Sequence, residues 1–128
     1  MSEVVLDSSA VLAVLQREPG GEEVADYLPG AFVSSVNLSE VAGKLMETGL
    51  PETEARRAVD ALGLVPVPFD PEDAWATGRL RVLTRRAGLS LGDRACLALA
   101  FARRVPAVTT DRAWRRLGLG AAVKVVGR

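Results

Sequence analysis

The sequence predicts an α/β protein with a central, mainly parallel sheet of five strands and helices on both faces. Short apolar runs alternate with longer segments whose apolar residues recur at helical spacing, the pattern of strands joined by helices. The 128 residues, 48% of them hydrophobic, are enough to bury a core. No repeat, low-complexity segment or long linker divides the chain. We therefore expect residues 1–128 to form a single domain.

The first predicted strand is residues 4–6, and a helix follows from about residue 9 to residue 17. The run Pro19-Gly20-Gly21 ends this helix. A short acidic helix is predicted at residues 21–28, where a Pro-Gly pair stops it, and the second strand at residues 31–35. This strand–helix–strand order is typical of a parallel sheet.

Two amphipathic helices and a third strand come next. In each helix the apolar residues fall at positions i, i+3, i+4 and i+7, which is the spacing of one helical face. These positions are Leu38, Val41, Ala42 and Leu45 in the first helix and Ala55, Ala58, Val59 and Leu62 in the second. Gly49-Leu50-Pro51 ends the first helix, Gly63 ends the second, and residues 64–67 form the third strand.

The second half begins with a long helix, for which Asp70 is the predicted N-cap and Pro71 the first residue. Its inward-facing residues are predicted to be Ala76, Leu80, Leu83 and Ala87. Residues 92–104 form a helix that is apolar on nearly all sides, so it should be the most buried one. The remaining elements are a strand at residues 106–109, a short helix at 111–117 and a strand at 123–126.

The single cysteine and the two tryptophans are expected to belong to the core. Cys96 is the one cysteine, which excludes an internal disulfide, and its apolar surroundings favour a buried small side chain over a catalytic thiol. Trp75 and Trp114 are expected to pack helices against the core, although stacking on bases is an alternative for both.

The chain contains no histidine. This excludes Ser-His-Asp and Cys-His nucleophiles, cleavage of RNA by histidine acid–base pairs, and most zinc sites. Hydrolytic chemistry here must therefore use carboxylates, hydroxyls or cations, with or without a hard metal ion.

Charge is unevenly distributed although the net charge is zero. Residues 1–64 hold 4 Lys and Arg against 11 Asp and Glu, and residues 65–128 hold 12 against 5. Arg79, Arg81, Arg85 and Arg86 are candidates for a diffuse RNA-binding track. The asymmetry fits a phosphate-binding face or simply solvated helix faces, and the sequence leaves both open.

Four acidic residues occupy comparable positions in different segments. Asp7 and Asp111 follow the first and fourth strands, and Glu40 and Asp93 lie in the first turns of helices. Because the carboxyl ends of parallel strands share one edge with the starts of the following helices, we expect the four to converge on one cleft.

Helix capping is the alternative for each acid taken singly. Asn37 with Glu40, and Ser90 with Asp93, have the spacing of a capping box. Four carboxylates at one edge would however repel one another unless a cation neutralised them. Mg²⁺ and Mn²⁺ prefer oxygen ligands, so the cluster indicates a hard-metal site.

At these residues the chain resembles the PIN-domain family, in particular the VapC-like toxins of bacterial toxin–antitoxin pairs. The matching segments occur in family order over nearly the whole chain. They are VVLDSSAVLAVL (4–15), VNLSEV (36–41), LSLGDRACLALA (89–100) and VTTDRAW (108–114).

The resemblance implies a three-layer α/β/α PIN-like fold and Mg²⁺ or Mn²⁺ held by Asp7, Glu40, Asp93 and Asp111, with Asp7 and Asp93 the firmest. It implies that Ser9, Asn37 and Thr110 orient acids or waters. It also implies hydrolysis of RNA phosphodiesters, which leaves a 5′-phosphate. Finally, it implies that the chain forms a homodimer and has a cognate antitoxin.

Arg94 and Arg112 adjoin acids in the sequence, and contact with phosphate and pairing with a carboxylate are equally open for both. We expect a cytoplasmic protein, since no apolar run reaches membrane-spanning length and the first residues do not resemble a signal peptide. The alternative functions are a catalytically silent PIN-like binding module and a phosphoacceptor signalling domain.

Overall fold

The centre of the molecule is a parallel sheet. In the computed structural model, which describes residues 3–127, its strand order is β3-β2-β1-β4-β5. Every neighbouring pair is parallel. The strands are β1 (Val5–Leu6), β2 (Phe32–Ser34), β3 (Val65–Val67), β4 (Ala107–Thr109) and β5 (Val123–Val125). The predicted parallel five-stranded sheet is confirmed.

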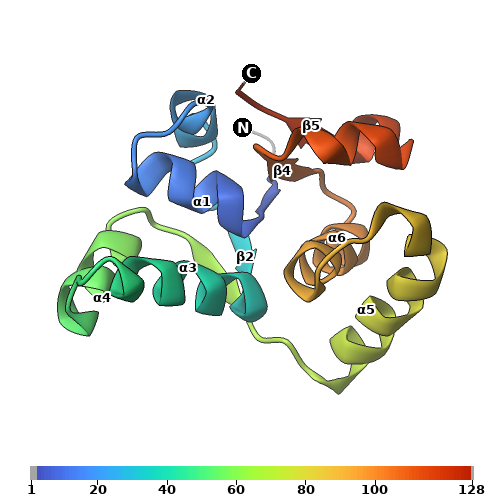
Figure 1. Cartoon of the computed structure of the whole chain (residues 1–128), viewed down its shortest axis with the longest axis horizontal. Helices are drawn as coiled ribbons and strands as arrows, with labels where there is room; N and C mark the ends of the chain where they lie inside the picture. Colours follow the sequence, from blue (N-terminus) through green and yellow to red (C-terminus); the bar gives the residue numbers. More distant parts are fainter. Residues whose placement is uncertain (1–2, 128) are drawn as a thin grey trace.

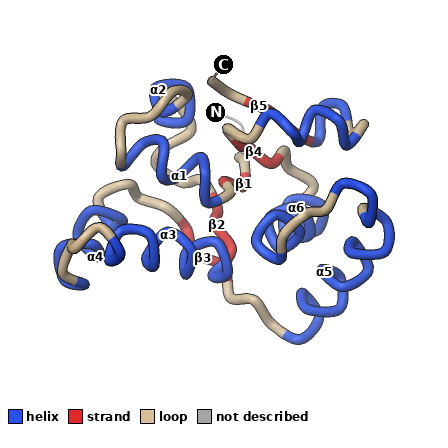
Figure 2. The backbone as a smooth tube through the Cα atoms, in the orientation of Figure 1, coloured by secondary structure: helices blue, strands red, loops and turns tan. Residues whose placement is uncertain are grey.

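Helices cover both faces of this sheet, as Figures 1 and 2 show. The α-helices are α1 (Ser8–Leu15), α2 (Gly21–Ala25), α3 (Ser35–Glu47), α4 (Glu52–Asp60), α5 (Pro71–Leu83) and α6 (Leu91–Arg103). Three 3₁₀ turns are η1 (Arg85–Ala87), η2 (Arg112–Leu117) and η3 (Gly120–Ala122). Helices α1 to α4 lie on one side and α5 and α6 on the other, so the predicted three-layer α/β/α architecture is confirmed.

The two cores follow from the alternation of side chains along the strands. Val4 and Leu6 point into the core under α1 to α4, and Val5 points into the core under α5 and α6. Helix α6 is the most buried helix, as predicted, and Cys96 within it is completely buried. Trp114 of η2 is 1% exposed and closes the second core.

The inward face predicted for α5 is partly wrong. Ala76 and Leu80 face inward, but Leu83 is 78% exposed and Ala87 is also exposed. Trp75, expected in the core, is 71% exposed. The cause is that α5 packs mainly against one neighbour, α6, and the helix ends at Leu83.

Helix α3 begins earlier than its apolar stripe indicates. It starts at Ser35 directly after β2, with the Ser34 hydroxyl accepting from the backbone N–H of Val36. Asn37 and Glu40 therefore lie inside the helix, so their predicted capping box is not formed. The capping boxes of Asp70 with Asp73 and of Ser90 with Asp93 are present.

Strand order reverses beside β1, because the chain moves outward through β2 and β3 and then returns to β4 on the opposite side of β1. In open parallel sheets, ligand sites form at such a reversal, outside the carboxyl ends of the strands. Asp7 follows β1 and Asp111 closely follows β4, so both flank this point. None of the helices within residues 3–127 is long and apolar enough to cross a membrane.

Candidate active site

A pocket of about 380 Å³ lies at this point and is lined by all four predicted acids. We call it the acid pocket; besides Asp7, Glu40, Asp93 and Asp111 it is lined by Ser8, Ser9, Leu12, Gln16, Glu18, Asn37 and Lys44. Segments far apart in the sequence thus meet at one edge of the sheet, as the sequence predicts. Glu18 and Lys44 belong to the lining but carry no signal in the sequence that would have indicated it.

Asp7 is 3% exposed, and protein donors occupy both of its carboxylate oxygens. Its Oδ1 atom accepts from the Ser9 hydroxyl and the Ala10 backbone N–H, each at 2.8 Å. Its Oδ2 atom accepts from the Thr109 hydroxyl at 2.5 Å. Asp7 is therefore both the N-cap of α1 and a link between β1 and β4.

These hydrogen bonds do not offset the cost of burying the charge. Burial raises the pKa of Asp7 from 3.8 to about 6, while the hydrogen bonds from Thr109, Ala10 and Ser9 act in the opposite direction and the charge of Asp93 adds a smaller increase. A cation in the acid pocket would offset this cost.

Glu40 is held by two neighbouring side chains. Its Oε1 atom accepts from the Ser8 hydroxyl and from the Asn37 Nδ2 atom, the latter at 3.1 Å. Asn37 is 1% exposed, and its Nδ2 atom also lies 3.1 Å from the Gly92 carbonyl oxygen at the start of α6. Asn37 thus joins the helix starts of α3 and α6, although these helices cover opposite faces of the sheet.

Gly92 leaves the space that Glu40 occupies. A Cβ atom at position 92 would lie 2.3 Å from the Oε1 atom of Glu40 and 2.4 Å from its Oε2 atom. Any larger residue would push the carboxylate away from its present position. The absence of a side chain here is therefore part of the site.

Asp93 and Asp111 have mainly local partners. The Oδ2 atom of Asp93 accepts from the Ser90 backbone N–H at 3.0 Å, and the Oδ1 atom of Asp111 accepts from the Ala113 N–H at 2.9 Å. The capping alternative is thus correct for both, and for Asp7. Capping still leaves Oδ1 of Asp93 and Oδ2 of Asp111 without a partner among residues 3–127, and Oε2 of Glu40 is equally free.

The donor set fits a hard divalent cation. Carboxylate oxygens are what Mg²⁺ and Mn²⁺ prefer, three of the four acids each present a free oxygen, and the buried Oδ1 atom of Asn37 has no partner. In the described part of the chain, no three acidic or cysteine side chains converge into a finished metal shell. The carboxylates line the walls of the pocket instead.

Three further residues that the sequence suggested for the site differ in how they lie relative to the acids. Arg94 is 8% exposed, and its Nη1 atom donates to the Thr77 carbonyl oxygen at 3.1 Å rather than to a carboxylate. Arg112 is exposed at the start of η2. Thr110 meets the site only through its backbone N–H, which donates to the Ser9 hydroxyl at 3.1 Å.

Thr109, Ser8 and Gly92 contact the acids and were not predicted. Side chains alternate along a strand, so if Val108 points into the core, its neighbour Thr109 points to the opposite face. Together with the pairing of β1 with β4, which the sequence does not show, this alternation would have favoured Thr109 over Thr110. Cys96 lies beneath the site: burial raises the pKa of its thiol well above the usual value, and the charges of Asp7, Asp93 and Glu40 add to the increase.

The fold is shared with solved toxin–antitoxin proteins. The chain resembles one in a toxin–antitoxin complex from Klebsiella pneumoniae (18% identity, TM-score 0.75, 95% of this chain and 96% of that chain). It also resembles one in DNA-bound VapBC from Salmonella typhimurium (21%, TM-score 0.74, 98% of each chain). A third similar structure is VapBC-5 from Mycobacterium tuberculosis (21%, TM-score 0.61, 100% of each chain).

At these identities the solved structures establish the fold alone. No curated protein matches the chain. The PIN domain family model matches residues 4–119, a span that includes all four acids of the pocket and nearly the whole chain. The chain therefore belongs to the PIN domain family.

Proposed function

We propose that the chain is a metal-dependent endoribonuclease, the toxin component of a toxin–antitoxin pair, and that it acts as a single PIN domain. The acid pocket carries the proposal. It brings four carboxylates from separate segments to the switch point of the sheet, and three of them keep a free oxygen on its wall. A buried Asp7 whose pKa is raised to about 6 provides a further reason for a cation to bind there.

Asp7, Glu40, Asp93 and Asp111 would hold Mg²⁺ or Mn²⁺. Bound there, the cation would lower the pKa of a water molecule and stabilise the negative charge that grows on a phosphate. Two of the carboxylates are held in fixed positions by hydrogen bonds: Asp7 by Ser9 and Thr109, and Glu40 by Ser8 and Asn37. This reduces the reorganisation needed during the reaction. Water attacks phosphorus and the bond between phosphorus and the 3′ oxygen breaks. This leaves a 5′-phosphate and a 3′-hydroxyl.

The similarity to solved toxin–antitoxin complexes supports a cognate antitoxin as a partner. We further propose a homodimer in the cytoplasm, as the family resemblance implies. The RNA substrate is supported by the resemblance and by the cationic second half of the chain.

The environment of Asp7 argues against a phosphoacceptor domain. A phosphoacceptor carboxylate must be open to a phosphodonor, whereas Asp7 is 3% exposed with both oxygens bonded. Lys124, the lysine nearest the last strand's end, lies on β5, and its ammonium group donates to the Tyr27 hydroxyl. The silent-module alternative differs from the proposal in predicting no binding of divalent cations.

Calorimetry with Mn²⁺ and Mg²⁺ and cleavage of a pool of structured RNAs test the proposal together. Asp93→Asn should weaken cation binding and reduce cleavage by roughly 100-fold or more. Asp60→Asn, an exposed acid on α4 outside the pocket, is the matched control and should leave both unchanged. Undiminished cleavage by Asp93→Asn would overturn the mechanism, and wild-type protein that binds neither cation would support the silent module.

A further inference from the structure

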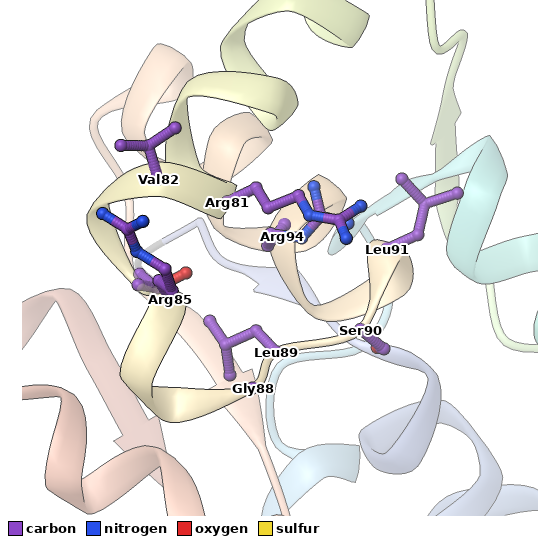
Figure 3. Close-up of a pocket in the computed structure, with 9 residues that line it drawn as sticks. Arg81, Val82, Arg85, Gly88, Leu89, Ser90, Leu91 and Arg94 are labelled. Carbon is purple, nitrogen blue, oxygen red and sulfur yellow. The ribbon is translucent and has the colours of Figure 1, made fainter.

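A second pocket lies beside the start of α6 and is lined by arginines. It measures about 520 Å³, and its charged lining residues are Arg81 from α5, Arg85 from η1 and Arg94 from α6. Thr84, Ser90 and backbone near Gly88 contribute polar groups, and no acidic residue lines it. We call it the arginine pocket; Figure 3 shows the Arg81 side chain extending toward Arg94.

Arg94 is the observation that points to a ligand. Its side chain is 92% buried, yet a guanidinium group has five N–H donors, and within residues 3–127 its only hydrogen bond is that from Nη1 to the Thr77 carbonyl oxygen. Its buried Nε atom has no partner. The only salt bridge among the described residues joins Arg56 to Glu52 on α4, so none of the three arginines is neutralised by a carboxylate.

A buried, under-paired guanidinium with two like charges beside it is costly unless an anion compensates it. The fork of donors on arginine matches the oxygens of a phosphate or carboxylate. The first turn of α6 lies at the same place and favours negative charge. The arginine pocket is therefore built for an oxyanion.

The position of the pocket favours a phosphate that belongs to the substrate. Ser90 lines the arginine pocket and Asp93 lines the acid pocket, and these two residues form one capping box, with hydrogen bonds of 3.0 and 3.1 Å. The two pockets are thus on either side of the same helix start. Both pockets therefore border the start of α6, where one polyanion can contact both.

We propose that Arg81, Arg85 and Arg94 bind a backbone phosphate of single-stranded RNA whose neighbouring phosphodiester lies in the acid pocket. This inference rests on the proposed function. Arg94 grips the phosphate from the floor of the pocket, and Arg81 and Arg85 close on it from the rim. The subsite positions the RNA and carries no base specificity, because phosphate contacts do not read sequence.

Binding of a labelled single-stranded oligouridine in EDTA tests the subsite apart from cleavage. Arg81→Gln with Arg85→Gln, both exposed residues, should weaken binding about tenfold or more at moderate salt. It should also flatten the slope of log K against log salt by up to about 0.7, the value for one phosphate contact with a single strand. The control Arg57→Gln with Arg115→Gln removes the same charge from exposed positions outside the pocket and should change binding less than twofold. Equal losses in the two double variants would overturn the subsite.

Arg94→Lys keeps the charge but loses the fork, so it should weaken RNA binding severalfold while its melting temperature stays close to that of the wild type. Affinity equal to the wild type would overturn the role of Arg94.

Two competitors test which ligand the arginine pocket binds. Tighter binding of a glutamate decapeptide than of oligouridine would assign the pocket to an acidic protein segment. Equal competition by inorganic phosphate would assign it to a free anion.

Cleavage assays separate this inference from the proposed function. A raised KM with little change in kcat for the Arg81/Arg85 variant supports the subsite. Normal KM in that variant, with active wild-type protein, overturns the subsite and leaves the nuclease intact. Loss of oligouridine binding in the variant when the wild type cleaves no RNA supports the subsite and overturns the nuclease.

Discussion

The hydroxyl group of Thr109 donates a hydrogen bond of 2.5 Å to the Oδ2 atom of Asp7, across 102 residues of sequence. The same hydroxyl oxygen accepts from the backbone N–H of Asp111 at 3.0 Å. One side chain therefore connects two of the acids of the pocket and joins β1 to β4, the strands between which the order of the sheet reverses.

Replacing Thr109 by Val removes this hydroxyl with little change in volume. Because the bond is to a charged, buried carboxylate, we expect a loss of about 1.5–3 kcal/mol in the free energy of unfolding at pH 8. The loss should be smaller at pH 4, where Asp7 is protonated in the folded protein. Denaturant titration at the two pH values measures the difference. Thr110→Val is the control, and an equal loss for both variants would contradict the assignment of the hydrogen bond to Thr109.

Asp7 makes the stability of the metal-free protein depend on pH. Its pKa is about 6 in the folded chain, mainly because of burial, against 3.8 ordinarily. The folded state therefore holds the proton more tightly than the unfolded state. The contribution of Asp7 is fully present below about pH 4 and is lost as the pH rises through about 6.

Asp7→Asn should remove this dependence while keeping the cap. In EDTA we expect the variant to be more stable than the wild type at pH 8, by up to about 3 kcal/mol, and the difference to approach zero near pH 4. Chemical denaturation across this range provides the measurement. A variant that is less stable than the wild type at pH 8 would show that the buried charge carries no such cost.

Gly92→Ala places a methyl group where the Glu40 carboxylate lies. The carboxylate is the end of a flexible side chain, so the fold should survive, with the free energy of unfolding within about 1 kcal/mol of the wild type. Glu40 should leave its contacts with Ser8 and Asn37, and cation affinity and cleavage should fall about 10- to 100-fold. Gly43→Ala on α3, where a Cβ atom has no neighbour within 4 Å, is the matched control and should retain both.

The two tryptophans should behave in opposite ways. Trp114→Ala opens a cavity in the second core and should cost about 3–5 kcal/mol, whereas Trp75→Ala should change stability by less than about 0.5 kcal/mol. Iodide should quench the fluorescence of a Trp114→Phe variant, which retains Trp75, far more than that of Trp75→Phe. Similar quenching in the two would contradict the exposure of Trp75.

Local signals in the sequence were reliable where the interaction is itself local. Asp70 and Ser90 cap their helices as predicted, because a cap needs only a residue three positions away. The pattern was less reliable for α5, where apolar spacing predicted that Leu83 faces inward. Which face of a helix is buried depends on how many neighbours cover it, and α5 is packed mainly against α6.

The sequence by itself determined that hydrolytic chemistry cannot use histidine, and that four carboxylates follow strands or start helices. The tertiary structure decided how they are used. The pairing of Leu6 with Val108 brings Thr109 rather than Thr110 to Asp7, and the meeting of α3 with α6 lets Glu40 occupy the space at Gly92. The physical reason is that strand register and helix packing are long-range properties. They set distances between residues that no local pattern connects.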